Sequence, residues 1–445
     1  MSNVQSINRR QFVAGSSGLL MAGAVQASQA EAAQPAGSKL AIHGGEKAVR
    51  QSVSYAPRWG DPEREQLEAM LRQNTLFYWG GPQTKQLIER FREFCPLEYV
   101  HTCSSGTAAL HIAVASAGIG LGDEVITSPI TDIGTVIGVL YQGAVPVFAD
   151  VGAGDCNLDV EDVRRRITPK TKAIIPVHLT GNPCDMDAIM AIAREHDLVV
   201  IEDCCQAWGA RSRGRPIGTV GHFACFSLQN SKHVTCGDGG VVASGDERFG
   251  PLLQRFGDKG AARGVTREGG GFRAFATNYR MSEPQAAVVA GQLTRLEEIA
   301  ARRARLGNLL TEHIADIPGI VPHEVHPEDR AVYWFYMFRV HPDAFRINRD
   351  DFARTLRAEG APASGGYIGV PLYGEPVFRE HGFIAGRWPV KEFGLTEMDF
   401  SQHKCPEAEA ILADMIRVTI NENMTEEYIV QVAQSIRKVA AHFAV

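Results

Sequence analysis

Residues 226–233 read Phe226-Ser227-Leu228-Gln229-Asn230-Ser231-Lys232-His233, and residues 234–242 read Val234-Thr235-Cys236-Gly237-Asp238-Gly239-Gly240-Val241-Val242. The apolar residues from 223 to 226 and those that end the stretch predict two buried strands with a tight polar loop between them. Lys232 lies in that loop. Partial burial would disfavour the charged form of its amine, lower its pKa and so provide a nucleophile. Taken alone, the stretch is better explained by an ordinary surface-loop lysine, so the rest of the chain must decide.

Composition places the chain among soluble globular enzymes. Its 445 residues suffice for one large core with a smaller domain, or for two comparable domains. Hydrophobic residues make up 44% and charged residues 22%, both ordinary values. The net charge of −6 means that the chain has no overall excess of basic residues, which argues against nucleic acid as a partner. No apolar run reaches the roughly 18 to 20 residues that a membrane span needs.

The first 33 residues resemble a twin-arginine export signal. Arg9 and Arg10 precede the aromatic Phe12, a weakly apolar run covers 13–27, and small residues that could be cleaved follow. A disordered basic start that happens to contain two arginines is the alternative. We therefore expect export to the periplasm through the twin-arginine machinery, or a cytoplasmic protein if the signal is not used. Residues 34–60 are expected to form an N-terminal extension.

The nine cysteines are irregularly spaced, and none forms a zinc-type Cys-x-x-Cys pair with a partner pair. Several lie inside apolar strand-like runs. We therefore expect free, mostly buried cysteines and no metal.

Apolar strands alternate with helices through the first half of the chain. Strands are expected over 99–103, 124–128, 145–150, 173–178 and 198–203, with helices between them. This alternation predicts a mostly parallel sheet covered by helices on both faces. Ligands bind beyond the carboxyl ends of such strands, where Asp203, His178, Ser105–Thr107 and the Lys232 loop all lie. Backbone N–H groups at the helix start after Ser105 form an anion site, although an ordinary Ser/Thr helix cap explains that stretch equally well.

The second half predicts a smaller domain. One long helix is expected from Ser282, followed by a strand over 332–340 and by helices over 350–359 and 425–440. We place the large domain at 61–290 and the small C-terminal domain at 291–445. The glycine-rich residues 268–271 and the Asn278–Arg280 segment are expected to form a flexible loop.

Several motifs occur together in one order. They are Gly44-Gly45 with Arg50, Ser105-Gly106-Thr107-Ala108-Ala109-Leu110-His111, Gly122-Asp123-Glu124-Val125-Ile126, Pro176-Val177-His178, Glu202-Asp203 with Gln206, Phe226-Ser227 with Lys232 and Gly237-Asp238-Gly239-Gly240, and Asn278-Tyr279-Arg280-Met281-Ser282-Glu283-Pro284-Gln285-Ala286-Ala287. From about Lys39 to the C-terminus, the chain resembles the sugar aminotransferases of the DegT/DnrJ/EryC1/StrS family. The resemblance implies the α/β PLP-dependent transferase fold type I, with a mostly parallel seven-stranded sheet, and pyridoxal 5'-phosphate (PLP) as cofactor.

The same resemblance implies roles for individual residues. Lys232 would hold the cofactor covalently and then move a proton between substrate and cofactor. Asp203 would keep the pyridine nitrogen protonated, with a helix N-cap as the alternative role. Gly106 and Thr107 would bind the cofactor phosphate, and Ser227 would add a contact.

Three further residues have less defined roles. Asn278 would reach the phosphate from a neighbouring subunit, which implies a homodimer with shared active sites. Gln206 would lie near the ring hydroxyl or the substrate. His178 is explained equally well as a structurally satisfied histidine at a strand end.

Three features depart from the family pattern. Asp132 occupies a position where an aromatic residue usually stacks on the cofactor ring, and a carboxylate cannot stack. Its alternative role is a helix cap. Residues 415–422 lack the usual Leu-Pro pattern, and an export signal is unusual in the family.

The resemblance favours an aminotransferase that moves an amino group from glutamate or glutamine to a nucleotide-linked keto sugar or a keto cyclitol. One alternative is a PLP-dependent dehydratase of the same family, in which histidine replaces the lysine. Another is a non-catalytic, PLP-binding regulatory protein, which only Asp132 supports.

Overall fold

The protein is described from a computed structural model that covers residues 39–53, 57–264 and 271–445. The predicted export signal lies outside these residues, as does most of the glycine-rich stretch 268–271. Residues Gly37–Val445 belong to one compact unit. Within the described part of the chain, no helix combines the length and apolar character needed to cross a membrane.

A seven-stranded sheet forms the centre of the large N-terminal portion. Its order is β1-β9-β8-β5-β4-β2-β3, and only β9 runs opposite to the other strands. The strands are β1 (Tyr99–Cys103), β2 (Glu124–Thr127), β3 (Val145–Phe148), β4 (Thr171–Ile175), β5 (Val199–Asp203), β8 (Phe223–Ser227) and β9 (Gly240–Ser244). The predicted mostly parallel sheet is confirmed, and each expected strand lies within a few residues of its predicted place.

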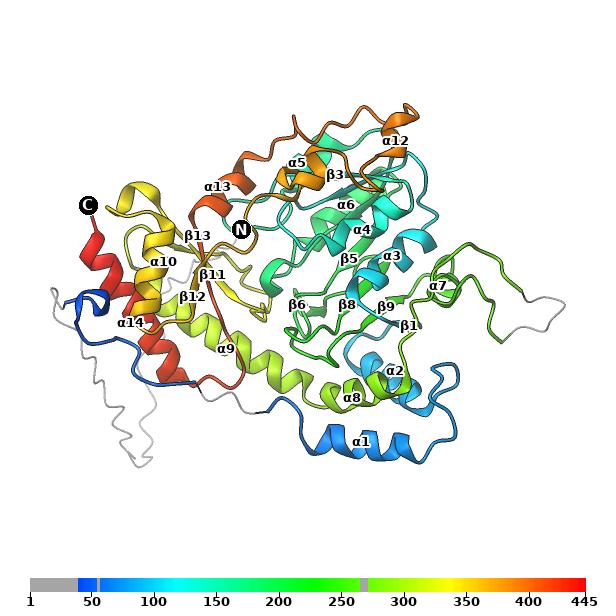
Figure 1. Ribbon diagram of the computed structural model, residues 1–445, viewed down its shortest axis with the longest axis horizontal. Helices are drawn as coiled ribbons and strands as arrows, with labels where there is room; N and C mark the ends of the chain where they lie inside the picture. The colour runs from blue at the N-terminus through cyan, green and yellow to red at the C-terminus, as the bar shows by residue number, and fades with distance from the viewer. Residues whose placement is uncertain (1–38, 54–56, 265–270) are drawn as a thin grey trace, which may run out of the picture. The chain divides into compact units, whose positions relative to one another are not determined.

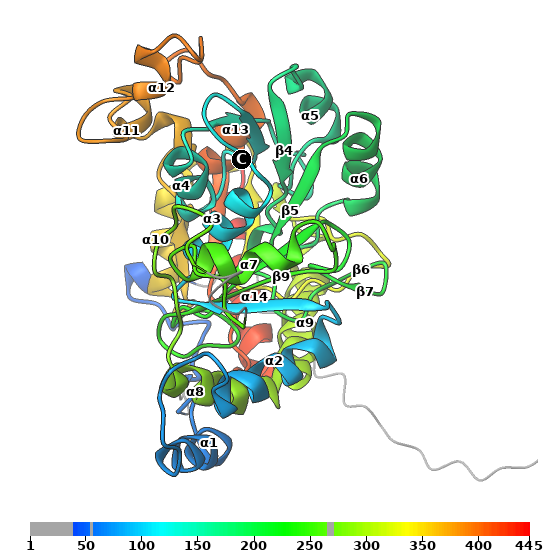
Figure 2. The same cartoon turned by 90° about the vertical axis from the view of Figure 1, so that its right-hand side faces the viewer.

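Helices cover both faces of this sheet because successive strand residues are apolar on both sides. Val125 and Ile201 pack with α3 (Gly106–Ser116), whereas Ile126 packs with α6 (Met186–Glu195) on the other face. Figure 2 shows α3 and α4 on one side of the sheet and α5 and α6 on the other. The remaining helices here are α1 (Asp61–Leu71), α2 (Pro82–Phe94), α4 (Gly134–Tyr141), α5 (Val160–Arg166), α7 (Gly250–Gly257) and α8 (Glu283–Leu293).

A second, four-stranded antiparallel sheet is built by the C-terminal part of the chain (Figure 1). Its order is β10-β11-β13-β12, from β10 (Ile320–Pro322), β11 (Tyr336–Val340), β12 (Ala363–Gly365) and β13 (Met415–Val418). One face packs on α9 (Leu296–Ile314), α10 (Arg349–Ala358) and α14 (Glu426–Phe443). The other face, which carries Met337 and Met415, packs with Ile130 and Leu179 of the larger portion. The short elements are β6 (Arg211–Ser212), β7 (Arg215–Pro216), α11 (Pro376–Arg379), α12 (Pro389–Glu392) and α13 (Pro406–Asp414).

Two predicted elements were wrong in extent. The expected single helix from Ser282 is two helices, α8 and α9, because the backbone leaves the helical conformation at Arg295, whose guanidinium is held by Glu63 at 2.5 Å. The expected strand over 332–340 begins only at Tyr336, because Tyr333 adopts a left-handed conformation with φ of 43°. The predicted domain boundary at 290/291 falls inside α8 and stays a prediction.

The nine cysteines are all free, and seven of them are buried. The expectation of free, mostly buried cysteines is confirmed.

Candidate active site

The Lys232 loop joins β8 to β9 at the carboxyl end of β8. The guanidinium of Arg58 donates hydrogen bonds to the backbone carbonyls of Asn230, Lys232 and His233. The buried His233 ring lies 3.1 Å from the carbonyl oxygen of Val332 through its Nε2. These contacts fix the loop, and they leave Lys232 8% exposed rather than in solvent.

The Lys232 amine lies in an aromatic and acidic environment. Its Nζ is 3.5 Å from the centroid of the Trp334 ring. Burial lowers the pKa of Lys232 below its ordinary value, and the nearby Cys205, Asp203 and Asp132 partly oppose that shift. A lowered pKa increases the fraction of neutral amine, which is the nucleophilic form. The environment therefore favours a reactive lysine over the ordinary loop lysine that the local sequence allowed.

Asp203 ends β5 and is 4% exposed. Its Oδ2 accepts a hydrogen bond from Thr135 Oγ1 at 2.8 Å, and its Oδ1 accepts one from the Cys205 backbone N–H at 3.1 Å. The alternative role as a helix N-cap is wrong, because turns rather than a helix follow Asp203. A carboxylate has about four acceptor positions, so Asp203 retains capacity for a further cationic N–H donor.

The start of α3 lies against the end of β8. A Cβ built on Gly106 would lie 2.7 Å from the Ser227 Cβ and 2.9 Å from Cys205 Sγ, so only glycine fits this approach. Ser105 is the N-cap, since its hydroxyl accepts from the Ala108 N–H at 3.0 Å. The cap therefore belongs to Ser105, and the N–H groups of Gly106 and Thr107 lie at the helix start, where backbone donors lack intrahelical partners.

Asp132 lies beside Thr107 at the start of α4. Its Oδ1 accepts the backbone N–H of Gly134 at 2.8 Å, which agrees with the alternative role as a helix cap. A Cβ built on Gly134 would be 2.6 Å from Thr107 Oγ1 and 2.9 Å from Asp132 Oδ1. The exposed Asp132 carboxylate is thus both a local cap and one of the charges that act on Lys232.

Gln206 links the large sheet to an aromatic group that sequence reasoning missed. Its Oε1 accepts from the Thr180 N–H at 2.8 Å, and its Nε2 donates to the Tyr367 hydroxyl at 3.3 Å. The Tyr367 ring lies 5.8 Å from that of Trp334. The aromatic run at 333–338 predicts a strand but does not indicate that Trp334 contacts Lys232.

Asn278 does not join the other predicted residues within this chain. It is exposed, and its Oδ1 accepts a hydrogen bond from the Arg280 N–H at 3.3 Å. Its backbone forms a bridge with Asp258. Its predicted role toward a neighbouring subunit stays a prediction.

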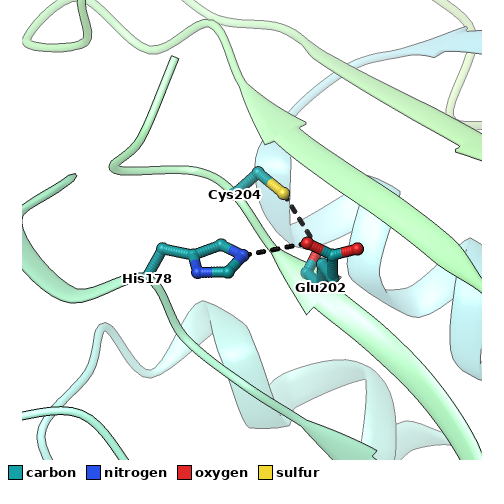
Figure 3. A group of neighbouring side chains, drawn as sticks. All are labelled: His178, Glu202 and Cys204. Atoms are coloured by element: carbon teal, nitrogen blue, oxygen red, sulfur yellow. Dashed lines mark hydrogen bonds and ion pairs between the residues drawn. The ribbon is translucent and has the colours of Figure 1, made fainter. Parts of the chain in front are cut away.

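His178 belongs to a separate buried network, shown in Figure 3. Its Nδ1 accepts from the Cys184 N–H at 3.1 Å, so Nε2 carries the proton and donates to Glu202 Oε2 at 3.1 Å. Glu202 also accepts backbone N–H groups from residues 218, 220 and 221. Ligand atoms of His178, Glu202 and Cys204 lie within 4.8 Å of one another. Both His178 ring nitrogens are used, so His178 fits the structural role better than a site role.

The described residues offer the chemical groups that PLP binding requires. The start of α3 and the Ser227 hydroxyl offer donors for a phosphate, Asp203 offers a buried carboxylate for the ring nitrogen, and Lys232 offers a buried amine. The close approach of Gly106 to Ser227 leaves the helix start unobstructed by a side chain.

The fold and this arrangement define a PLP-dependent transferase of fold type I. The chain belongs to the DegT/DnrJ/EryC1/StrS aminotransferase family, whose model matches residues 58–437. It is therefore an aminotransferase, and PLP is the expected cofactor because the family depends on it.

Named relatives and solved structures agree with this membership. The chain is 33% identical over 384 residues to a putative L-glutamine:3-amino-2,3-dideoxy-scyllo-inosose aminotransferase of Micromonospora echinospora, and the match covers 84% of this chain and 90% of the relative. It is 36% identical over 308 residues to the GDP-perosamine synthase of Caulobacter vibrioides, and this match covers 68% of this chain and 81% of the relative. The X-ray structure of an aminotransferase from Psychrobacter cryohalolentis superposes with a TM-score of 0.79 at 30% identity, covering 88% of this chain and all of the other.

Proposed function

We propose that this aminotransferase moves an amino group from glutamate or glutamine to a nucleotide-linked keto sugar or a keto cyclitol, with PLP held by Lys232. The observation that carries the proposal is the buried Lys232 amine, which shares its surroundings with Asp203 and lies in the loop after β8. The substrate classes are supported by the relatives, one named for a perosamine sugar and one for an amino-inosose.

Each residue would have a distinct task. When bound, PLP supplies a carbonyl that links to amino groups and a ring that accepts electrons. Asp203 would hold a proton on the ring nitrogen through its remaining acceptor capacity. The Lys232 Nζ would accept the proton from the substrate carbon that bears the amine and would return it on the other side of that nitrogen, to the carbon that the cofactor's carbonyl supplies. The N–H groups of Gly106 and Thr107, with the Ser227 hydroxyl, hold the phosphate.

The alternative functions have weaker support. A dehydratase of this family would need histidine at the lysine position, and here Lys232 occupies it while the neighbouring His233 ring is buried against the carbonyl of Val332. A regulatory protein without turnover would rest on Asp132 alone. The hydrogen bond of Asp132 to Gly134 gives that residue a structural use and so weakens this support.

Assembly and location are part of the proposal. Asn278 would bind the phosphate in the site of a second copy, which makes a homodimer the active unit. The exposed position of Asn278 allows this reach. The paired arginines at 9 and 10 support export to the periplasm by the twin-arginine route. Without export, the protein would act in the cytoplasm.

The proposal is tested by the absorbance of the PLP-loaded protein. Glutamate or glutamine should convert the band of lysine-linked cofactor into that of the amine form, and a keto-sugar nucleotide or keto-inositol should restore it. In Lys232→Ala the lysine-linked band should be absent. Failure of both amino donors to change the wild-type spectrum would support the regulatory alternative instead.

A further inference from the structure

Trp334 lies just before β11, and hydrogen bonds fix both its backbone and its indole ring. Its backbone N–H donates to the Thr180 carbonyl at 2.6 Å, and its own carbonyl accepts from the Arg303 guanidinium at 3.4 Å. The indole Nε1–H donates to the Ser231 carbonyl at 2.9 Å. Because Ser231 directly precedes Lys232, these contacts hold the indole beside the lysine loop.

The Lys232 amine lies over the face of this indole. Its Nζ is 3.5 Å from the ring centroid, a distance at which the electron-rich face of tryptophan attracts a cation. Within the part of the chain that the structure describes, Nζ makes no hydrogen bond or ion pair. Burial lowers the pKa of Lys232, and Cys205, Asp203 and Asp132 oppose this shift without a hydrogen bond to the amine. The indole face is therefore the direct contact of the amine.

Two further titratable groups near the indole and the amine stay uncharged. Burial and the neighbouring Arg303 guanidinium keep the pKa of His233 well below its ordinary value. The Tyr367 ring lies 5.8 Å from the indole, and burial raises the pKa of its hydroxyl. Neither group therefore supplies a negative charge to neutralise a protonated Lys232.

The proposed reaction requires Lys232 to carry a proton for part of each cycle. After its Nζ takes the proton from the substrate carbon, and until it returns that proton, the side chain is an ammonium group that is 8% exposed. Burial disfavours this charge. An aromatic face attracts an ammonium group but, unlike a carboxylate, does not accept its protons in strong hydrogen bonds, so the N–H groups stay available for the return of the proton.

We propose that Trp334 is a positioning residue whose indole face holds the Lys232 ammonium group between the two proton transfers. The inference rests on the proposed function and adds to it a residue that acts through the lysine. The contact lies within the protein itself, so it is measurable without substrate as well as during the reaction.

The first measurement is the protonation of Lys232 in the full-length protein freed of PLP. Trace acetic anhydride reacts with neutral amines, and peptide mass mapping across a pH series gives the pKa of Lys232, with the exposed Lys172 as the reference. Replacement of Trp334 by tetrafluorinated tryptophan keeps the shape of the ring but removes its negative face. At a pH below the pKa, Lys232 should then react about 2- to 30-fold faster, which corresponds to the loss of a cation–π contact of about 0.5 to 2 kcal/mol.

Two substitutions separate the ring face from the indole N–H. Trp334→Leu removes both and should lower the pKa of Lys232, whereas Trp334→Phe keeps a ring face and should lie between wild type and Trp334→Leu. Equal effects of the two substitutions would assign the role to the hydrogen bond with Ser231 and overturn the inference. An unchanged pKa of Lys232 in the fluorinated protein would also overturn it. If Trp334→Leu does not fold, the fluorinated protein decides.

The second measurement is the glutamate half-reaction of the PLP-loaded protein, followed by cofactor absorbance. Fluorination of Trp334 should slow the maximal rate about 2- to 30-fold and leave the half-saturating glutamate concentration unchanged. Phe393→Leu, a change at an exposed aromatic residue after α12, should react as wild type. A raised half-saturating concentration at an unchanged maximal rate would make Trp334 a substrate contact and overturn the inference. If glutamate leaves the wild-type spectrum unchanged while fluorination still lowers the pKa of Lys232, the proposed function fails and the contact stands.

Discussion

Glu202 and Asp203 are adjacent carboxylates at the end of β5, both buried, and they have opposite environments. Glu202 accepts three backbone N–H groups and the His178 Nε2–H, which matches the acceptor capacity of a carboxylate. Asp203 accepts two protein donors and shares its surroundings with the Lys232 amine. The pleat of the strand directs the two side chains to opposite faces of the sheet.

The difference separates a carboxylate whose acceptor positions are all used within the fold from one that is proposed to act on a ligand. Hydrogen bonds from the protein saturate Glu202, so it has nothing left to offer a substrate. Asp203 is held in place by Thr135 and Cys205 but keeps acceptor capacity. Burial alone therefore does not distinguish the two carboxylates, whereas unused acceptor capacity makes Asp203 the candidate for ligand binding.

The largest expected effect is on catalysis, from Asp203→Asn. An amide cannot hold a proton on the ring nitrogen, so the rate of the glutamate half-reaction should fall about 10²- to 10⁴-fold. Stopped-flow absorbance of the PLP-loaded variant measures this rate. The melting temperature should change little, because the amide oxygen can accept from the Cys205 N–H while the Thr135 hydroxyl, which can also act as an acceptor, faces the new NH₂ group. A rate within tenfold of wild type would remove Asp203 from the chemistry.

The matched change on the neighbouring residue should affect stability instead. Glu202→Gln turns an NH₂ group against backbone N–H donors at a fully buried position, which should cost about 3 kcal/mol of unfolding free energy. Urea unfolding measures the loss. The half-reaction rate of the folded fraction should stay within about threefold of wild type, which corresponds to a change in the activation barrier of less than about 1 kcal/mol. A rate loss comparable to that of Asp203→Asn would contradict the assignment of a purely structural role to Glu202.

A smaller effect concerns acid stability. Burial alone would raise the pKa of Glu202, but hydrogen bonds from His178 and from backbone N–H groups lower it below its usual value. Because the folded-state pKa lies below the unfolded-state value, Glu202 stabilises the protein fully above the unfolded pKa. That contribution is lost as pH falls through the folded pKa. Between about pH 6 and pH 4, where an unfolded glutamate begins to titrate, wild type should lose more stability than Glu202→Gln. Equal losses of unfolding free energy in wild type and Glu202→Gln between these pH values would contradict a lowered pKa of Glu202 in the folded protein.

Sequence reasoning was most successful where local patterns carry the information. The stretch 198–203 is an apolar run that ends in two carboxylates, and such a run predicts a buried strand. Asp203 and Lys232 could be predicted as neighbours because Asp203 ends one strand, Lys232 follows another, and parallel strands end at one edge of the sheet.

Other features depend on contacts between distant segments. Trp334 lies about a hundred residues from Lys232 in sequence, and only the packing of the small sheet brings them together. The break before α9 falls at Arg295, whose guanidinium donates to the distant Glu63, a contact that local sequence does not indicate. The structural role of His178 likewise required its partners Cys184 and Glu202 in space.

The central claim is that Lys232 holds the cofactor, and borohydride reduction of the PLP-loaded protein tests it most directly. Reduction fixes any lysine-linked cofactor, and peptide mass mapping then locates it. The account predicts one phosphopyridoxyl adduct, on the peptide that contains Lys232, and none in Lys232→Ala. An adduct on a different lysine in the wild-type protein, or none at all, would contradict it.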